Sequence, residues 1–330
     1  MTKCFSLTAT RNFCLRSSFS TSGLRSTITD LGDGTIIHCW VPKTRKQTRP
    51  DLLLLHGFGA NAMWQWGPDI IPRFVHHFNV YVPDLVFFGD SFTTRSDRSE
   101  SFQAECVYRV MEMNSVTKGV RVVGLSYGGF VAYSLAAQFK EFVERVVICC
   151  AGVCLEEKDI ADGLFVVKDL DEAADMLLPQ TVEKMKDLMR VTFVKPPVKT
   201  PNCILVDFID EMNRENLQEK RELVHALAKD RKLSELPKIP QPTLIIWGEQ
   251  DKVFPVELGY RLKRHLGDNA DLVVLKDTGH AYIVEKTKEF YKHLKSFLLP
   301  QIPPIPSSTA TTNQQDPHHL HSNGTITITT

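Results

Sequence analysis

The five residues 124–128 constrain the fold of this chain more than any other feature. They read Gly-Leu-Ser-Tyr-Gly, and they overlap the end of the apolar segment 121–124. That segment is typical of a short buried strand, and the apolar residues after it recur at helical spacing. The pattern therefore predicts a strand, a sharp turn that holds Ser126, and a helix. A turn of this kind exposes a serine hydroxyl, as nucleophilic chemistry requires.

Two other apolar segments end in residues that could assist such a serine. Residues 242–248 read as a buried strand and lead into an acidic loop that contains Asp251. Residues 272–275 read as another strand, and His280 follows five residues later. The carboxyl ends of parallel strands share one edge of a sheet, so the serine, the carboxylate and the histidine could meet there. Their order along the chain is the one used by hydrolases with a serine turn of this type.

Four separated motifs resemble those of the serine hydrolases of the α/β-hydrolase superfamily, over most of residues 30–299. Three are the segments around Ser126, Asp251 and His280, and the fourth is Leu-Leu-Leu-Leu-His-Gly-Phe-Gly at 52–59. The sequence looks most like plant monoacylglycerol-lipase-like hydrolases and, next, bacterial meta-cleavage-product hydrolases. The resemblance implies an α/β-hydrolase fold, which is a mostly parallel, doubly wound sheet with an inserted helical cap.

The resemblance also implies a mechanism that needs neither a metal nor an organic cofactor. His280 would take the proton of the Ser126 hydroxyl and later pass it to the leaving group, while Asp251 would orient the imidazole. Glu249 and Asp277 lie close by in the sequence and are alternatives for the acid.

An oxyanion that forms during such a reaction needs hydrogen-bond donors that are already in place. By resemblance, these donors are the backbone N–H groups of Phe58 and Tyr127. His56 is interpreted as a structural residue that shapes the oxyanion loop.

One segment departs from the pattern of the family. Residues 86–88 are Val-Phe-Phe, where relatives commonly have small or polar residues. These bulky groups are expected to make the nearby pocket more hydrophobic. Phe87 and Trp64 are the candidates for substrate binding, with packing in the core or pocket wall as the alternative.

The expected function is hydrolysis of a carboxylic ester with an apolar acyl group, either a monoacylglycerol or a specialised-metabolite ester. A carbon–carbon bond hydrolase of the meta-cleavage type is one alternative, because it uses the same three residues. A slow receptor-like protein of the strigolactone or karrikin kind is another. The serine motif of that group usually lacks the double glycine found here at 128–129.

Composition limits the partners. The 330 residues hold 39 basic and 39 acidic side chains, so net charge gives no reason to expect a nucleic acid. No apolar run is long enough to span a bilayer. The eight cysteines have no paired C-x-x-C spacing, which indicates reduced thiols and a reducing compartment. We therefore expect a cytoplasmic protein with a small-molecule ester as partner; the oligomeric state stays open.

The chain is expected to divide into a leader at 1–29, a hydrolase core at 30–151 and 239–299, a helical cap at 152–238 and a disordered tail at 300–330. The leader has no acid and many Ser and Thr residues, so a plastid or mitochondrial transit peptide is the alternative location signal. Its apolar residues could instead dock on the core or contact a lipid surface. Within the cap, periodicity predicts helices near 170–178, 181–190, 203–212 and 215–229.

Overall fold

A computed structural model describes residues 6–197 and 200–299. The tail predicted at 300–330 lies outside the described residues. Within them, the strands form one sheet in the spatial order β1-β2-β4-β3-β6-β7-β8-β9, and β5 pairs with β2. The mostly parallel α/β sheet that the sequence predicts is confirmed.

The sheet consists of a parallel part and an antiparallel edge. The parallel strands, in spatial order, are β4 (Asn79–Pro83), β3 (Asp51–Leu55), β6 (Val120–Leu125), β7 (Val143–Cys149), β8 (Thr243–Gly248) and β9 (Ala270–Leu275). The antiparallel strands are β1 (Leu24–Asp30), β2 (Thr35–Pro42) and β5 (Phe92–Thr93). Strands β3, β4, β6 and β8 are buried at every position, which requires cover on both faces of the sheet.

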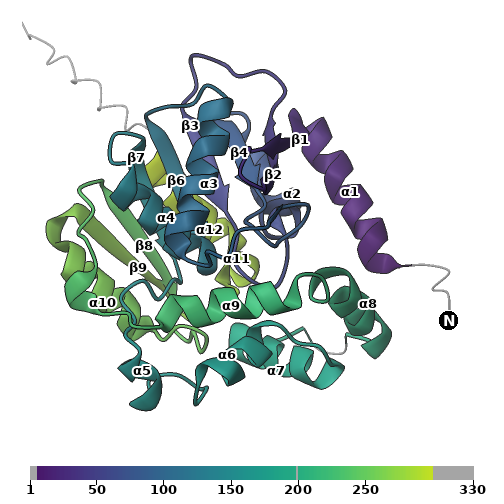
Figure 1. Ribbon diagram of the computed structural model, residues 1–330, viewed down its shortest axis with the longest axis vertical. Coiled ribbons are helices and arrows are strands. Elements are labelled where there is room, and N and C mark those ends of the chain that lie inside the picture. Colours follow the sequence, from purple (N-terminus) through teal and green to yellow (C-terminus); the bar gives the residue numbers. More distant parts are fainter. Residues whose placement is uncertain (1–5, 198–199, 300–330) are drawn as a thin grey trace, which may run out of the picture. The chain divides into compact units, whose positions relative to one another are not determined.

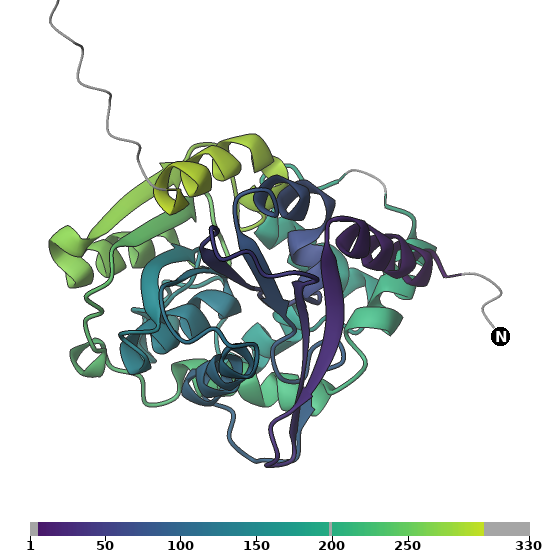
Figure 2. The ribbon, with the colours of Figure 1, turned by 90° about the horizontal axis from the view of Figure 1, so that it is seen from above.

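Helices supply this cover on both faces. Helices α2 (Ala62–Phe74) and α12 (Thr287–Leu298) lie on one side of the sheet, and α3 (Glu100–Met113) and α4 (Tyr127–Gln138) lie on the other (Figure 2). Helix α10 (Val256–Leu266) connects β8 to β9, and the short α11 (Tyr282–Glu285) precedes α12. The helix that follows each parallel strand begins beyond the carboxyl end of that strand.

In the described residues between β7 and β8, five α-helices and one short 3-10 helix (Leu233–Glu235) are inserted. The α-helices are α5 (Lys158–Ala161), α6 (Leu170–Leu177), α7 (Val182–Thr192), α8 (Asn202–Met212) and α9 (Leu217–Ala228), and they gather below the sheet in Figure 1. The four helices predicted there are confirmed. Side-chain caps begin two of them: Asp169 accepts from the N–H of Glu172, and Thr181 accepts from that of Lys184. Buried Met185, Leu205 and Ile209 form a small separate core between α7 and α8.

The described part of the predicted leader packs on the rest of the molecule. Helix α1 (Leu7–Thr21) buries Leu15 and Phe19, and β1 pairs with β2 along its whole length. The backbone N–H of Thr8 donates to Asp207 on α8 over 2.7 Å, so α1 is linked to the inserted helices. In residues 6–197 and 200–299 there is no helix with the length and hydrophobicity needed to cross a membrane.

Candidate active site

Ser126 lies in the sharp turn between β6 and α4. Its backbone has φ 53° and ψ −120°, a strained conformation for a residue with a side chain. The N–H of Ser126 donates to the carbonyl of Cys149 over 2.8 Å, which ties the turn to the end of β7. A side chain at Gly124 would overlap the backbone of Gly128, so β6 and α4 can approach this closely only because residue 124 is glycine.

Gly128 allows a second close approach, between α4 and the end of β3, and this one can be tested. A Cβ atom there would collide with the carbonyl oxygens of Leu55 and His56, which are backbone atoms and cannot rotate away. We expect Gly128→Ala to lower the free energy of unfolding by about 3 kcal/mol, as measured by urea denaturation. Ser134→Ala, on the same helix, is the control and should stay near wild type. Wild-type stability of Gly128→Ala would contradict the tight packing described here.

A chain of hydrogen bonds leads from Ser126 into the interior. The Nε2 atom of His280 lies 3.0 Å from Ser126 Oγ, and its Nδ1 atom lies 2.8 Å from Asp251 Oδ2. The other carboxylate oxygen of Asp251 accepts the N–H groups of Val253 and Phe254 over 2.8 and 2.9 Å. Because a carboxylate only accepts, the imidazole proton lies on Nδ1, and the lone pair of Nε2 faces the serine hydroxyl. This geometry can transfer the hydroxyl proton to His280.

The two alternative acids lie elsewhere. Glu249 is exposed and accepts the backbone N–H of Asp277 over 3.1 Å, whereas the carboxylate of Asp251 is fully buried against His280. The structure thus brings Asp251 to the imidazole.

Cys150 is a member of this site that the sequence did not single out. Its Sγ atom lies within 4.8 Å of ligand atoms of Asp251 and His280, and it accepts the N–H of Gly248 over 3.4 Å. Burial, together with the nearby Asp251 charge, raises the pKa of the Cys150 thiol well above its usual value. The thiol therefore stays neutral beside the carboxylate of Asp251. The only sequence signal was its place at the end of the β7 strand.

The loop after β3 comes close to the serine. A Cβ atom on Gly57 would lie 2.8 Å from Ser126 Cβ, so the backbone of this loop passes directly beside the nucleophile candidate. The Nε2 atom of His56 accepts the N–H of Leu85 over 2.9 Å, which places its proton on Nδ1, where it donates to Gly57 O over 2.8 Å. Burial lowers the pKa of His56, so the ring stays neutral. These contacts support the structural role expected for His56.

Phe58 and Tyr127 bring two backbone amides to the same region. In the part of the chain that the structure describes, neither N–H donates to a protein acceptor. Tyr127 is the first residue of α4, where the helix dipole favours negative charge. The rings of Phe58 and Tyr127 pack against each other at 5.0 Å, and Phe88 packs on Phe58 at 5.1 Å. Phe88 is thus packed on the ring of Phe58, and its effect on the polarity of the pocket stays a prediction.

Trp64 and Phe87 have protein neighbours on several sides. The ring of Trp64 lies 4.8 Å from the Arg11 guanidinium of α1 and 5.2 Å from the ring of Phe208 of α8. Phe87 has φ 75° and lies 4.7 Å below the Arg98 guanidinium. These contacts favour packing between the core, α1 and the inserted helices. A role of either residue in substrate binding stays a prediction.

A family model described as "Alpha/beta hydrolase family" matches residues 52–292, which include the turn of Ser126, Asp251 and His280. The chain belongs to the alpha/beta hydrolase family. Within this family, the chain is 30% identical over 278 residues to monoacylglycerol lipase abhd6-B of Xenopus laevis, which covers 80% of each chain. Lipases are among the relatives of this α/β-hydrolase, which supports the assignment of the chain as a carboxylic ester hydrolase.

Solved structures share the fold of this α/β-hydrolase. The esterase EaEST from Exiguobacterium antarcticum has a TM-score of 0.67 at 20% identity, with 83% of this chain and 99% of that chain covered. The meta-cleavage product hydrolase CumD from Pseudomonas fluorescens has a TM-score of 0.66 at 23% identity, with 84% and 98% covered. These relatives are from an animal and from bacteria; the special likeness to plant proteins stays a prediction.

Proposed function

We propose that this α/β-hydrolase cleaves carboxylic esters with an apolar acyl chain, such as a monoacylglycerol or a specialised-metabolite ester, through Ser126, His280 and Asp251. The observation that carries the proposal is the continuous hydrogen-bonded chain from Ser126 Oγ through His280 to Asp251, at 3.0 and 2.8 Å. Fold similarity to a carbon–carbon bond hydrolase does not by itself favour that chemistry, because one fold hosts many activities.

In the proposed reaction, Ser126 Oγ attacks the ester carbonyl carbon while its proton moves to His280 Nε2. The carbonyl oxygen becomes an oxyanion, which the N–H groups of Phe58 and Tyr127 stabilise. His280 then gives the proton to the alcohol as it leaves, and an acyl-enzyme remains on Ser126. Water attacks the acyl-enzyme with His280 as the base, which releases the acid and restores the serine.

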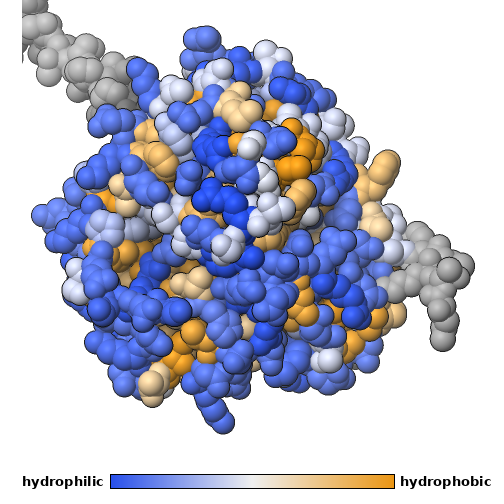
Figure 3. All heavy atoms as spheres, viewed as in Figure 1, coloured by the Kyte–Doolittle hydropathy of each residue, from blue (hydrophilic) through white to orange (hydrophobic). Residues whose placement is uncertain are grey.

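An apolar cavity between the inserted helices and the loop after β8 is the candidate acyl-binding site. Its free volume is about 70 Å³. Its wall includes Phe254, whose ring lies 5.9 Å from that of His280. Val166, on the rim, is 56% exposed, and apolar side chains form small groups over the cap in Figure 3. The further lining includes Leu155, Ile160, Phe165, Val167, Leu170, Ala173, Met176, Leu177, Val191, Val224, Leu227 and Ala228.

Steady-state hydrolysis of a chain-length series of p-nitrophenyl and monoacylglycerol esters tests the proposal. We expect many turnovers, with a preference for apolar acyl groups that fill the cavity. A vinylogous diketone should not be cleaved. Cleavage of the diketone without ester hydrolysis would favour the carbon–carbon bond hydrolase. Ester hydrolysis that stops after a single turnover would favour the receptor-like alternative.

The cavity itself can be tested by filling it. Ala173 on α6 lines the cavity, so Ala173→Phe should shorten the preferred acyl chain and lower kcat/KM for the longest esters about tenfold or more. Ala161→Phe is the matched control because Ala161 is exposed on the neighbouring helix α5. The same chain-length profile in wild type, variant and control would show that acyl chains do not enter this cavity.

A further inference from the structure

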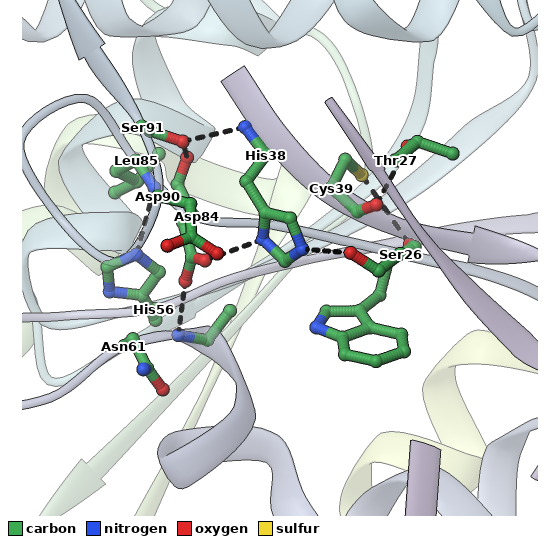
Figure 4. A network of polar contacts seen from close by, with 12 residues as sticks. Ser26, Thr27, His38, Cys39, His56, Asn61, Asp84, Leu85, Asp90 and Ser91 are labelled. Carbon is green, nitrogen blue, oxygen red and sulfur yellow. Dashed lines mark hydrogen bonds and ion pairs between the residues drawn. The ribbon is translucent and has the colours of Figure 1, made fainter. Parts of the chain in front are cut away.

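A buried histidine and aspartate lie behind the loop that carries Phe58. Asp84 follows β4, and His38 lies in β2; their side chains are 4% and 1% exposed. His38 Nδ1 lies 2.7 Å from Asp84 Oδ2, and the backbone N–H of Asp84 donates to His38 O over 3.0 Å. Figure 4 shows the imidazole and the carboxylate directed at each other. The pair is thus joined through both side chain and backbone.

The second oxygen of Asp84 reaches the loop. Asp84 Oδ1 accepts the N–H of Ala62 over 2.8 Å, and Ala62 is the first residue of α2, directly after the loop 56–61. At the other end of the loop, His56 accepts the N–H of Leu85 over 2.9 Å. The loop that places the Phe58 amide is therefore attached at both ends to two consecutive residues after β4.

His38 is itself fixed in one orientation. Its Nε2 atom lies 2.8 Å from Ser26 Oγ, and its backbone N–H donates to Ser91 Oγ over 2.9 Å (Figure 4). Ser91 Oγ in turn donates to the carbonyl of Asp84 over 2.8 Å. Because Nδ1 faces a carboxylate, it carries the proton, and Nε2 accepts from Ser26. Removing His38 would leave one oxygen of a buried carboxylate without this donor.

We propose that His38 and Asp84 are positioning residues for the oxyanion hole: they fix the backbone of the loop 56–61 so that the Phe58 amide points at the developing oxyanion. The inference rests on the proposed function for its effect on catalysis. Neither side chain touches the substrate in this account. A pair that serves only to stabilise the fold would change the unfolding temperature without lowering kcat in the folded enzyme.

His38→Ala and His38→Asn form a matched test. The asparagine amide can still donate to Asp84 Oδ2 from about the position of Nδ1, whereas alanine cannot. We expect His38→Ala to lower kcat for p-nitrophenyl butyrate about 30-fold or more, with KM within about threefold of wild type, because misplaced donors cost mainly transition-state stabilisation. His38→Asn should recover most of that loss. A folded His38→Ala enzyme with wild-type kcat would overturn the inference.

Hydrogen exchange of the Ala62 amide gives a second readout that needs no substrate. This N–H should exchange about tenfold faster or more in His38→Ala than in wild type, while amides of β6 keep their rates. An unchanged exchange rate of the Ala62 amide in His38→Ala would overturn the inference. If the wild type is inert on esters, only the proposed function is refuted, and the exchange measurement still tests the inference. If His38→Ala does not fold, the comparison of His38→Asn with wild type decides: near-normal kcat and Ala62 exchange support the role of the donor, and loss of both contradicts it.

Discussion

Ser126→Ala is expected to lower kcat for ester hydrolysis at least about a thousandfold, because it removes the atom that forms the acyl-enzyme. The hydroxyl lies 3.0 Å from His280 Nε2, and alanine keeps the backbone N–H of residue 126 that bonds to Cys149 and holds the turn. Steady-state kinetics on p-nitrophenyl butyrate measures the loss. Urea denaturation should show that the variant is folded.

Ser134→Ala is the control for this measurement, since Ser134 lies on α4 two turns from the nucleophile candidate and its Oγ atom contacts Gln138. Its kcat should stay near wild type. A Ser126→Ala enzyme that keeps more than about a tenth of the wild-type kcat would remove Ser126 from the role of nucleophile.

Asp251→Asn is expected to lower kcat by about 10³ to 10⁴, although it changes the shape of the side chain very little. The N–H groups of Val253 and Phe254 both donate to Asp251 Oδ1, so the asparagine oxygen must stay at that position. Its NH₂ group then faces His280 Nδ1, which must become an acceptor. The imidazole proton moves to Nε2, and His280 can no longer take the proton of Ser126.

Glu249→Gln and Asp277→Asn provide the comparison. These residues were the alternatives for the acid; both are exposed, and the Glu249 carboxylate accepts the backbone N–H of Asp277. Both variants should keep kcat near wild type in the same assay. A large loss in either one, with Asp251→Asn fully active, would show that the acid has been assigned to the wrong carboxylate.

Local pattern was sufficient to predict the elements that carry the site. The strand, turn and helix around Ser126 follow from an apolar run, two glycines and helical spacing, and β8 and β9 end where Asp251 and His280 were expected. The helices of the cap were predicted for the same reason, since their apolar residues recur along one face of each helix. In each case the information lies within one short segment.

The contacts between distant segments could not be predicted in this way. Thr8 meets Asp207 across 199 residues, and His38 meets Asp84 across 46. No local sequence pattern predicts either contact. A single histidine in an apolar strand, such as His38, can equally be a core residue, a ligand or a partner of a distant carboxylate. Cys150 was one cysteine among eight until the sheet order placed β7 beside both β6 and β8. Such residues are found only when the topology is known.

Reaction with a fluorophosphonate, followed by peptide mass spectrometry, tests the central claim most directly. The account predicts one adduct, on Ser126, and a loss of ester hydrolysis in proportion to the fraction of protein labelled. Asp251→Asn should label far more slowly, because its His280 cannot accept the serine proton. Full ester hydrolysis by protein that is completely labelled at Ser126, or inactivation with the adduct on another residue, would contradict it.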